Sequence, residues 1–160
     1  MVFRIFLSHS TRDQGIVVTL ANLMTKLGIE VLVAEWYLTP GSSLDEKVFQ
    51  QIDESDSVVV LLTQNGVRSN WVNQELGYAL KAGKPVIPLV EKGIAERQLG
   101  SLQGKEYIEY DPDQPQQSLT KASAFMNSLK LDKENREKGL LVIGGIVLLL
   151  LLLSGTGGAR

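Results

Sequence analysis

An aromatic ring and a carboxylate stand four residues apart at the start of a predicted helix, as Trp71 and Glu75. Residues i and i+4 of a helix lie above one another on the same face. We expect Asn70 to cap this helix and Glu75 to be half-buried beside the ring. A carboxylate in that setting can act on a sugar or hold a cationic ring. The buried stripe of the same helix is predicted to comprise Val72, Leu76, Ala79 and Gly83.

The composition excludes several kinds of site and partner. The chain of 160 residues has 18 acidic and 16 basic residues and a net charge of -2, so no nucleic-acid partner is expected. There is no cysteine, and His9 is the single histidine. Disulfides, thiol nucleophiles, cysteine zinc sites and histidine-rich metal sites are therefore excluded, and no metal site is predicted. An enzyme built from this chain must use carboxylates and hydroxyls.

Short β-branched runs alternate with amphipathic stretches through the first 130 residues. Residues 58–62 are all apolar, without the in-out alternation of a half-exposed strand, which is typical of a strand covered on both faces. This alternation of strands and helices predicts an α/β fold with a doubly wound parallel sheet, whose ligand cleft lies beyond the carboxyl ends of the strands. The predicted strands are 4–8, 30–34, 57–63, 85–90 and 106–110, and the apolar periods predict helices around 16–27, 44–52, 72–80 and 119–129.

Three loops should line that cleft, namely 8–13, 35–43 and 64–70. The sequence of residues 43–46 is a capping box that opens the second helix. Residues 91–105 show no clear period. The glycines and lysine of 100–105 imitate a phosphate loop, but one spacer residue is missing and no Ser or Thr follows the lysine, so this reading is rejected.

Residues 139–159 carry no charge and contain an almost continuous apolar run. The strictly apolar run, 140–153, is shorter than the ~20 residues that a helix needs to cross a bilayer, but the whole uncharged segment reaches that length. We predict a transmembrane helix here, joined to the domain by a charged linker, 131–138. The alternative is a buried hairpin or core helix, which would need apolar cover on every side.

The charges that flank this segment are unequal. By the positive-inside rule, the excess of basic residues before it keeps the N-terminal domain in the cytoplasm. We therefore expect a single-pass protein of the cell membrane. The basic residues concerned are Lys130, Lys133, Arg136 and Lys138 before the segment and Arg160 after it.

A set of motifs in a fixed order resembles the prokaryotic type of Toll/interleukin receptor (TIR) domain. The resemblance covers residues 4–129 and implies a flavodoxin-like, three-layer TIR domain over residues 1–130. It also implies that copies of the chain associate through TIR–TIR contacts. The motifs are Phe6-Leu7-Ser8-His9-Ser10, Pro40-Gly41, Ser55-Asp56 before the third strand, and Trp71-x-x-x-Glu75-Leu76.

Many TIR domains cleave the bond between nicotinamide and ribose in NAD+, and the resemblance implies that Glu75 is the catalytic glutamate. NAD+ is then a substrate, and no cofactor is expected. Nicotinamide leaves as a neutral ring, so no acid is required. The carboxylate would hydrogen-bond the ribose hydroxyls and stabilise an oxocarbenium-like centre. The product can be ADP-ribose or a cyclic ADP-ribose, in a prokaryotic antiviral defence or signalling response triggered by self-assembly.

The substrate-binding candidates lie in the same loops and the same helix. An aromatic face attracts a cationic ring by roughly 0.5 to 2 kcal/mol, and backbone amides of the first two loops, with Arg12 or Arg68, could hold the diphosphate. Each aromatic residue has an alternative role, as a structural plug or a contact with another subunit, and the histidine could be structural. The serines of the first loop lack a base and are not expected to be nucleophiles. The candidates are Ser8, His9, Ser10, Trp36, Tyr37, Gly41, Ser43, Arg68 and Trp71.

Two other functions remain in view. A membrane-anchored TIR adaptor would act by homotypic association and would have no need of a carboxylate at Glu75. An anchor that confines copies to one plane would favour assembly in either case, by raising their effective concentration. A receiver-like phosphoacceptor domain needs acidic residues at the strand ends, whereas the first strand ends in Ser8-His9-Ser10.

Overall fold

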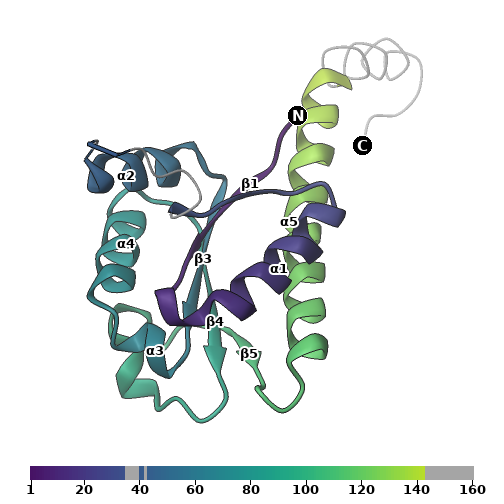
Figure 1. Cartoon of the computed structure of the whole chain (residues 1–160). Coiled ribbons are helices and arrows are strands. Elements are labelled where there is room, and N and C mark those ends of the chain that lie inside the picture. Colours follow the sequence, from purple (N-terminus) through teal and green to yellow (C-terminus); the bar gives the residue numbers. More distant parts are fainter. Residues whose placement is uncertain (35–39, 42, 143–160) are drawn as a thin grey trace, which may run out of the picture.

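A computed structural model describes residues 1–34, 40–41 and 43–142 of the chain (Figure 1). Five strands form one sheet in the order β2-β1-β3-β4-β5, and every neighbouring pair is parallel. The predicted five-stranded parallel sheet is confirmed, and each predicted strand overlaps an observed one. The strands are β1 Arg4–Ser8, β2 Glu30–Leu32, β3 Ser57–Leu62, β4 Val86–Glu91 and β5 Ile108–Tyr110.

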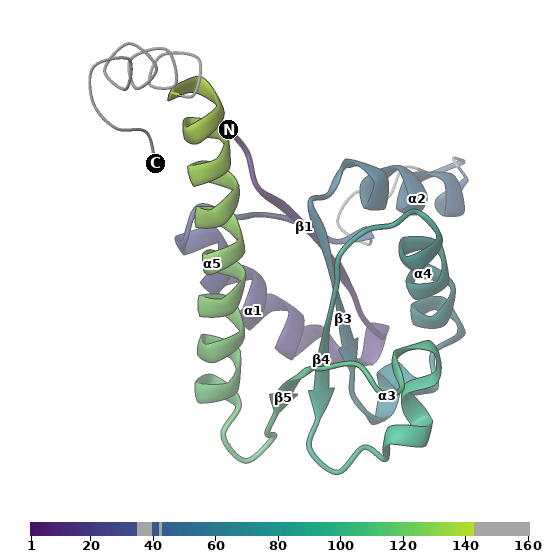
Figure 2. The same ribbon diagram turned by 180° about the vertical axis from the view of Figure 1, so that it is seen from behind.

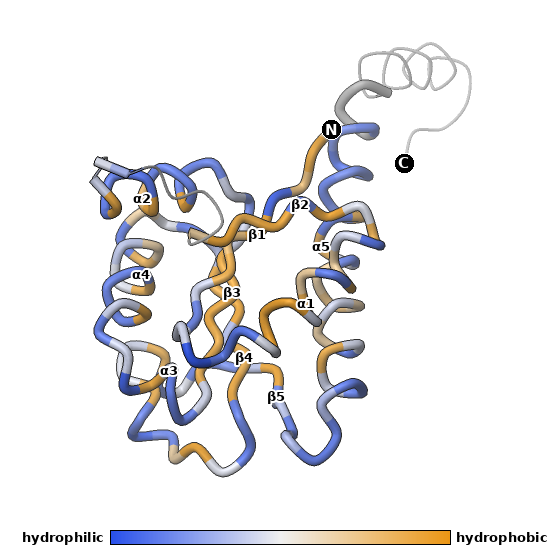
Figure 3. The backbone as a smooth tube through the Cα atoms, viewed as in Figure 1, coloured by the Kyte–Doolittle hydropathy of each residue, from blue (hydrophilic) through white to orange (hydrophobic). Residues whose placement is uncertain are grey.

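Helices cover both faces of the sheet, which gives three layers (Figures 1 and 2). The helices α1 (Gln14–Lys26) and α5 (Pro115–Val142) pack on one face, and α2 (Leu44–Glu54) and α4 (Asn70–Lys81) pack on the other. Each residue of β3 is buried, as a strand between two apolar layers must be. Figure 3 shows this pattern, because the tube of β1, β3 and β4 is hydrophobic while the helices carry both kinds of residue.

Serine side chains open two of the helices. Ser43 Oγ accepts a hydrogen bond from the Glu46 backbone N–H at 3.5 Å, as the capping box predicts for α2. At α4 the cap is Ser69, whose Oγ accepts from the Val72 N–H at 3.2 Å. The prediction that Asn70 caps α4 is therefore wrong. Serine and asparagine are comparable caps, and Ser69 is the one with extended backbone while Asn70 is already helical.

A short helix, α3 (Gln64–Val67), occupies part of the predicted loop 64–70. Thr63 Oγ1 caps it by accepting from the Gly66 N–H at 2.9 Å. A β-carbon at Gly66 would lie 2.2 Å from the Leu61 carbonyl oxygen, so only glycine lets the chain turn this close to the end of β3. The segment without clear period, 91–105, contains the 3-10 helix η3 (Glu96–Leu102).

Helix α5 runs past the predicted helix and through residues 131–138, the predicted linker. Two lysines fasten this part of α5 to the body of the protein. Lys130 Nζ donates to the Leu27 carbonyl at 2.9 Å, and Lys133 Nζ donates to Asp56 Oδ1 at 2.8 Å and to the Val2 carbonyl at 2.9 Å. These contacts hold this part of α5 beside the amino ends of the strands and stabilise its helical conformation.

The predicted transmembrane segment, 139–159, lies largely outside the described residues, which end at 142. Within the described ranges, none of the helices combines the length and the apolar character that a bilayer crossing requires.

Candidate active site

Ser8 and Glu75 meet at the carboxyl edge of the sheet. Ser8 is the last residue of β1, Glu75 lies in the second turn of α4, and Ser8 Oγ donates a hydrogen bond to Glu75 Oε2. Glu75 is 3% exposed, so the prediction that it is half-buried is wrong. The helix is rotated so that Val72, Glu75, Leu76 and Ala79 all face the sheet.

A buried carboxylate is costly unless hydrogen bonds satisfy it. The hydroxyl of Ser8, itself fully buried, supplies such a bond from the neighbouring element. No basic partner for Ser8 was predicted from the sequence, and the structure places the Glu75 carboxylate beside it. In the ionised form this carboxylate accepts the serine proton in a hydrogen bond and holds the hydroxyl in one orientation.

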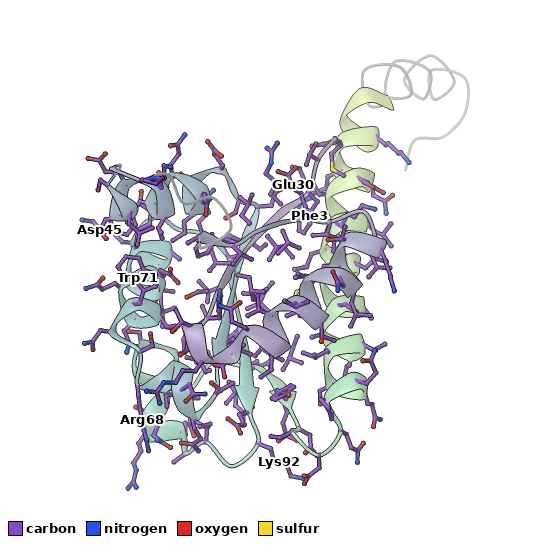
Figure 4. The ribbon with its side chains drawn as sticks, viewed as in Figure 1. Phe3, Glu30, Asp45, Arg68, Trp71 and Lys92 are labelled. Carbon is purple, nitrogen blue, oxygen red and sulfur yellow. The ribbon has the colours of Figure 1, made fainter. Side chains whose placement is uncertain are left out.

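Trp71 lies one turn before Glu75 on α4 (Figure 4). It is partly buried and packs against the apolar cluster between α2, α4 and the sheet. The interpretation of Trp71 as a structural plug therefore has contacts to support it, and its exposed part leaves a substrate contact open.

His9 and Ser10 are buried directly after β1. His9 Nδ1 lies 3.1 Å from the Leu7 carbonyl oxygen, which can only accept, so this contact places the proton on Nδ1. Ser10 Oγ accepts from the Arg12 backbone N–H at 3.3 Å and caps the 3-10 helix η1 (Thr11–Asp13). Both side chains thus shape the loop that leaves β1.

A hollow of about 330 Å³ opens at the carboxyl ends of β1 and β3, where the N-terminus of α4 begins. It brings together two predicted site residues, Ser10 and Arg68, with Arg12, the other arginine that was expected to hold a diphosphate. Figure 4 shows Arg68 at the end of the molecule where α4 starts. We call this feature the arginine hollow, and its lining residues are Ser10, Arg12, Asn65, Arg68 and Ser69.

Asp13 is a buried carboxylate behind this hollow that the sequence analysis missed. It is 6% exposed. Its Oδ2 accepts from Thr63 Oγ1 at 2.6 Å, and its Oδ1 accepts from Asn65 Nδ2 at 3.0 Å. Asp13 thereby ties η1 to the connection between β3 and α4. The signal available in the sequence was an acidic residue after one strand and two hydrogen-bond donors after the neighbouring strand.

Tyr110, at the end of β5, lies in the electrostatic field of two carboxylates, those of Asp13 and Glu91. Burial raises the pKa of the Tyr110 phenol, and the negative charges of Glu91 and Asp13 raise it further. Glu91 Oε2 also accepts from the Gln64 backbone N–H at 2.8 Å, at the start of α3. The carboxyl edge of the sheet therefore holds acidic side chains that are each engaged by donors.

The remaining predicted site residues belong to the loop before α2. Gly41 is exposed, with φ of 84°, a conformation that favours glycine. Ser43 is exposed and its hydroxyl serves as the cap of α2. Trp36 and Tyr37 lie outside the described residues. Among the described residues, no group of three or more acidic or histidine side chains is arranged to hold a metal ion.

The arrangement joins a buried carboxylate to a nearby cationic hollow. A carboxylate with a fixed hydroxyl beside it can accept hydrogen bonds from sugar hydroxyls and stabilise positive charge on a sugar carbon. Arg68, just before the start of the same helix, and Arg12, in η1, suit an anionic group. The carboxylate and the arginines together would suit a ligand that carries both a cationic and an anionic part.

Comparisons with known proteins agree with this architecture. The family model for the TIR domain matches residues 5–122. TIR2 of Cytobacillus dafuensis is 26% identical over 110 residues, which cover 64% of this chain and 29% of that protein. The 2′ cyclic ADP-D-ribose synthase AbTIR of Acinetobacter baumannii is 27% identical over 95 residues, which cover 56% of this chain and 35% of AbTIR.

The matched region thus spans about a third of the length of these curated relatives. Among solved structures, the TIR domain of the Toll-related receptor TRR-2 from Hydra magnipapillata superimposes with a TM-score of 0.61 at 19% identity. That match covers 82% of this chain and 97% of the Hydra domain. At this identity, the likeness establishes the fold.

Proposed function

The chain belongs to the TIR domain family, and from that premise we propose that it cleaves the bond between nicotinamide and ribose in NAD+. The proposal rests above all on the buried pair of Ser8 and Glu75 at the carboxyl edge of the sheet. Ligands of open α/β sheets bind at this edge. The name of AbTIR, a 2′ cyclic ADP-D-ribose synthase, supports the same chemistry for a relative.

Glu75 is the catalytic residue of this proposal. As the bond between C1′ and the nicotinamide nitrogen breaks, the bonding pair leaves with the nitrogen, and the ring becomes neutral. Positive charge then develops on the ribose, where a carboxylate stabilises it more strongly in a buried site than in water. Ser8 keeps the Glu75 carboxylate in a fixed orientation before the substrate arrives.

The nucleophile determines the product. Attack by water at C1′ forms a new C–O bond, releases one proton and gives ADP-ribose. Attack by a ribose hydroxyl or an adenine nitrogen of the same molecule gives a cyclic ADP-ribose instead. We propose NAD+ glycohydrolase or ADP-ribosyl cyclase activity, and the product analysis described below distinguishes them.

Burial of Glu75 bears on regulation. At 3% exposure, its carboxylate must become accessible before a ribose can reach it. We propose that self-association through TIR–TIR contacts produces the accessible form, so that the enzyme is activated by assembly. The apolar segment 139–159 would anchor the copies in the cell membrane with the TIR domain facing the cytoplasm, in prokaryotic antiviral defence or signalling.

One observation favours the alternative function. The same burial of Glu75 would suit a non-catalytic, membrane-anchored adaptor that acts only through TIR–TIR contacts. The test is release of nicotinamide from NAD+ by the purified full chain on lipid vesicles, followed by chromatography. Release by the wild type supports the enzyme, whereas no release at any density on the vesicles leaves the adaptor.

A further inference from the structure

A second hollow lies at the opposite edge of the sheet, between the amino ends of the strands and α5. Its volume is about 650 Å³, against about 330 Å³ for the arginine hollow. Sites for small molecules commonly measure roughly 300 to 1,000 Å³. We call this feature the amino-edge hollow. Figure 4 shows Phe3, one of its lining residues, beside α5 and well away from Arg68.

The strands give the amino-edge hollow an apolar floor that contains one buried hydroxyl. Phe3, Ser57 and Pro85 line it, at or just before the first residues of β1, β3 and β4. Side chains alternate along a strand, so Ser57 shares its face with Val59 and Leu61, which pack toward α1 and α5. Ser57 is 4% exposed, and its hydroxyl makes no hydrogen bond to another residue that the structure describes. Because buried polar groups are normally hydrogen-bonded, a ligand in the hollow would supply a missing partner.

The opposite wall is a stretch of α5 that begins at Leu129. Two charged side chains of this stretch, Asp132 and Arg136, line the hollow and are exposed. They stand four residues apart, a spacing at which opposite charges on a helix commonly pair. Within the described ranges, however, neither side chain takes part in an ion pair or a hydrogen bond.

The other two charges of the lining are already paired. Lys133 Nζ lies 2.8 Å from Asp56 Oδ1, and both residues line the hollow. Lys133 Nζ also lies 3.9 Å from Glu137 Oε1, one turn further along α5. The charges of Asp56 and Lys133 therefore balance each other. The carboxylate of Asp132 and the guanidinium of Arg136 remain available to a ligand.

Charges of both signs beside an apolar floor suit a zwitterion with an apolar body. A guanidinium binds a carboxylate through two parallel hydrogen bonds, and a carboxylate accepts hydrogen bonds from an ammonium group. We propose that the amino-edge hollow binds a small molecule of this class, an amino acid with an aromatic or aliphatic side chain. Arg136 binds its carboxylate, and Asp132 binds its ammonium group. The apolar body lies against Phe3, Pro85 and Leu129.

The amino-edge hollow is separate from the proposed catalytic edge. Strand β3 begins at Ser57, in the floor of the hollow, and its six residues extend over about 20 Å toward the edge where Ser8 and Glu75 meet. The inference therefore does not rest on cleavage of NAD+, and the two ligands do not compete for one place.

The first experiment titrates the purified full chain with L-tryptophan by calorimetry. Three further probes each lack one feature of this molecule: tryptamine has no carboxylate, indole-3-propionate has no ammonium group, and glycine has no apolar body. Each should bind at least about tenfold more weakly, since a charge-assisted contact or the burial of the ring is lost. Absence of saturable L-tryptophan binding, or equal affinity for all four probes, would overturn the inference.

Two variants separate the roles of the two charges. Arg136→Gln should weaken L-tryptophan binding about tenfold without weakening that of tryptamine. Asp132→Asn should also weaken L-tryptophan binding, but not that of indole-3-propionate. Lys138→Gln is the control, because it removes an exposed positive charge of α5 outside the lining. Equal weakening by Lys138→Gln, or the reverse pattern between the two probes, would contradict the proposal.

A competition experiment tests the separation of the two edges. L-tryptophan should bind equally well with and without excess NAD+, measured in Glu75→Gln so that the dinucleotide is preserved. Displacement of L-tryptophan by NAD+ would place the hollow on the path of the dinucleotide and overturn the inference. If NAD+ is never cleaved by the wild type, the proposed function fails, while the probe and variant patterns still decide the case of the amino-edge hollow.

Discussion

The Ser8 hydroxyl donates a hydrogen bond to the Glu75 carboxylate and so connects two residues that are 67 positions apart in the sequence. The bond joins the end of β1 to the second turn of α4 at the edge of the sheet where ligands of this architecture bind. Both partners are buried. It is the contact on which the proposed chemistry and the stability of this corner of the fold both depend.

Replacement of Ser8 by alanine should lower the free energy of unfolding by about 1 to 3 kcal/mol, because a buried carboxylate loses a donor. Urea denaturation of the full chain measures this change. Ser10→Ala is the control, since this buried serine also loses a hydrogen bond, the 3.3 Å bond from the Arg12 backbone N–H, but that bond involves no carboxylate. Equal effects of the two changes would show that the bond to Glu75 contributes nothing specific.

Thr63→Val should be more harmful than Thr63→Ser. Valine removes both the hydrogen bond to the buried Asp13 carboxylate and the cap of α3, for a loss of about 2 kcal/mol or more. Serine retains the hydroxyl and should cost much less. The comparison is made by thermal and urea denaturation, and similar losses in both variants would contradict the network described around Asp13.

Gly66→Ala should be severely destabilising, by more than about 2 kcal/mol, because the added methyl group would meet the Leu61 carbonyl at 2.2 Å. Gly77→Ala is the matched control. At Gly77, on the exposed side of α4, a β-carbon meets nothing within 4 Å, and alanine should stabilise the helix by about 0.5 to 1 kcal/mol. Opposite signs in urea denaturation are expected; a stable Gly66→Ala protein would contradict the turn geometry.

Asp111 should make stability depend on pH in the acid range. The Asp113 N–H that donates to its carboxylate, and next the contact of Lys92, hold the pKa of Asp111 below its ordinary value of 3.8. A lowered pKa means that the ionised form stabilises the fold at pH values above 3.8. This contribution is lost as the pH falls through the lower folded-state pKa.

As the pH is lowered below 3.8, the unfolding free energy of Asp111→Asn should therefore fall less steeply than that of the wild type. Urea midpoints measured between neutral pH and about pH 3 test this. Asp113→Asn is the control, because its contact with Asp111 uses the backbone N–H, which the substitution retains. An unchanged acid decline in Asp111→Asn would contradict the expected linkage.

The sheet could be predicted because its determinants are local. A run such as that of β3 has β-branched and apolar residues at every position, and burial on both faces imposes that composition. Helix positions followed from apolar periods, and the cap of α2 from its serine and glutamate. The cap of α4 was predicted one residue late, since serine and asparagine at 69 and 70 compete for the same role.

The site was harder to predict because its contacts connect distant parts of the chain. The motif around Glu75 indicated the residue, but its burial depends on how far α4 is rotated against the sheet. Asp13 contacts residues that are 50 and 52 positions away, and no periodic pattern reveals such a pair. Helix α3, with four residues, is too short to produce a period at all.

The most direct test of the proposed function measures NAD+ loss and product formation by the full chain and by Glu75→Gln. The proteins are concentrated on vesicles, and their folding is checked by circular dichroism. The wild type should release nicotinamide together with ADP-ribose or a cyclic ADP-ribose, and Glu75→Gln should be slower by about 10² or more. A folded Glu75→Gln protein that cleaves NAD+ at the wild-type rate would contradict the role of Glu75, and a wild type without turnover would contradict the enzymatic function.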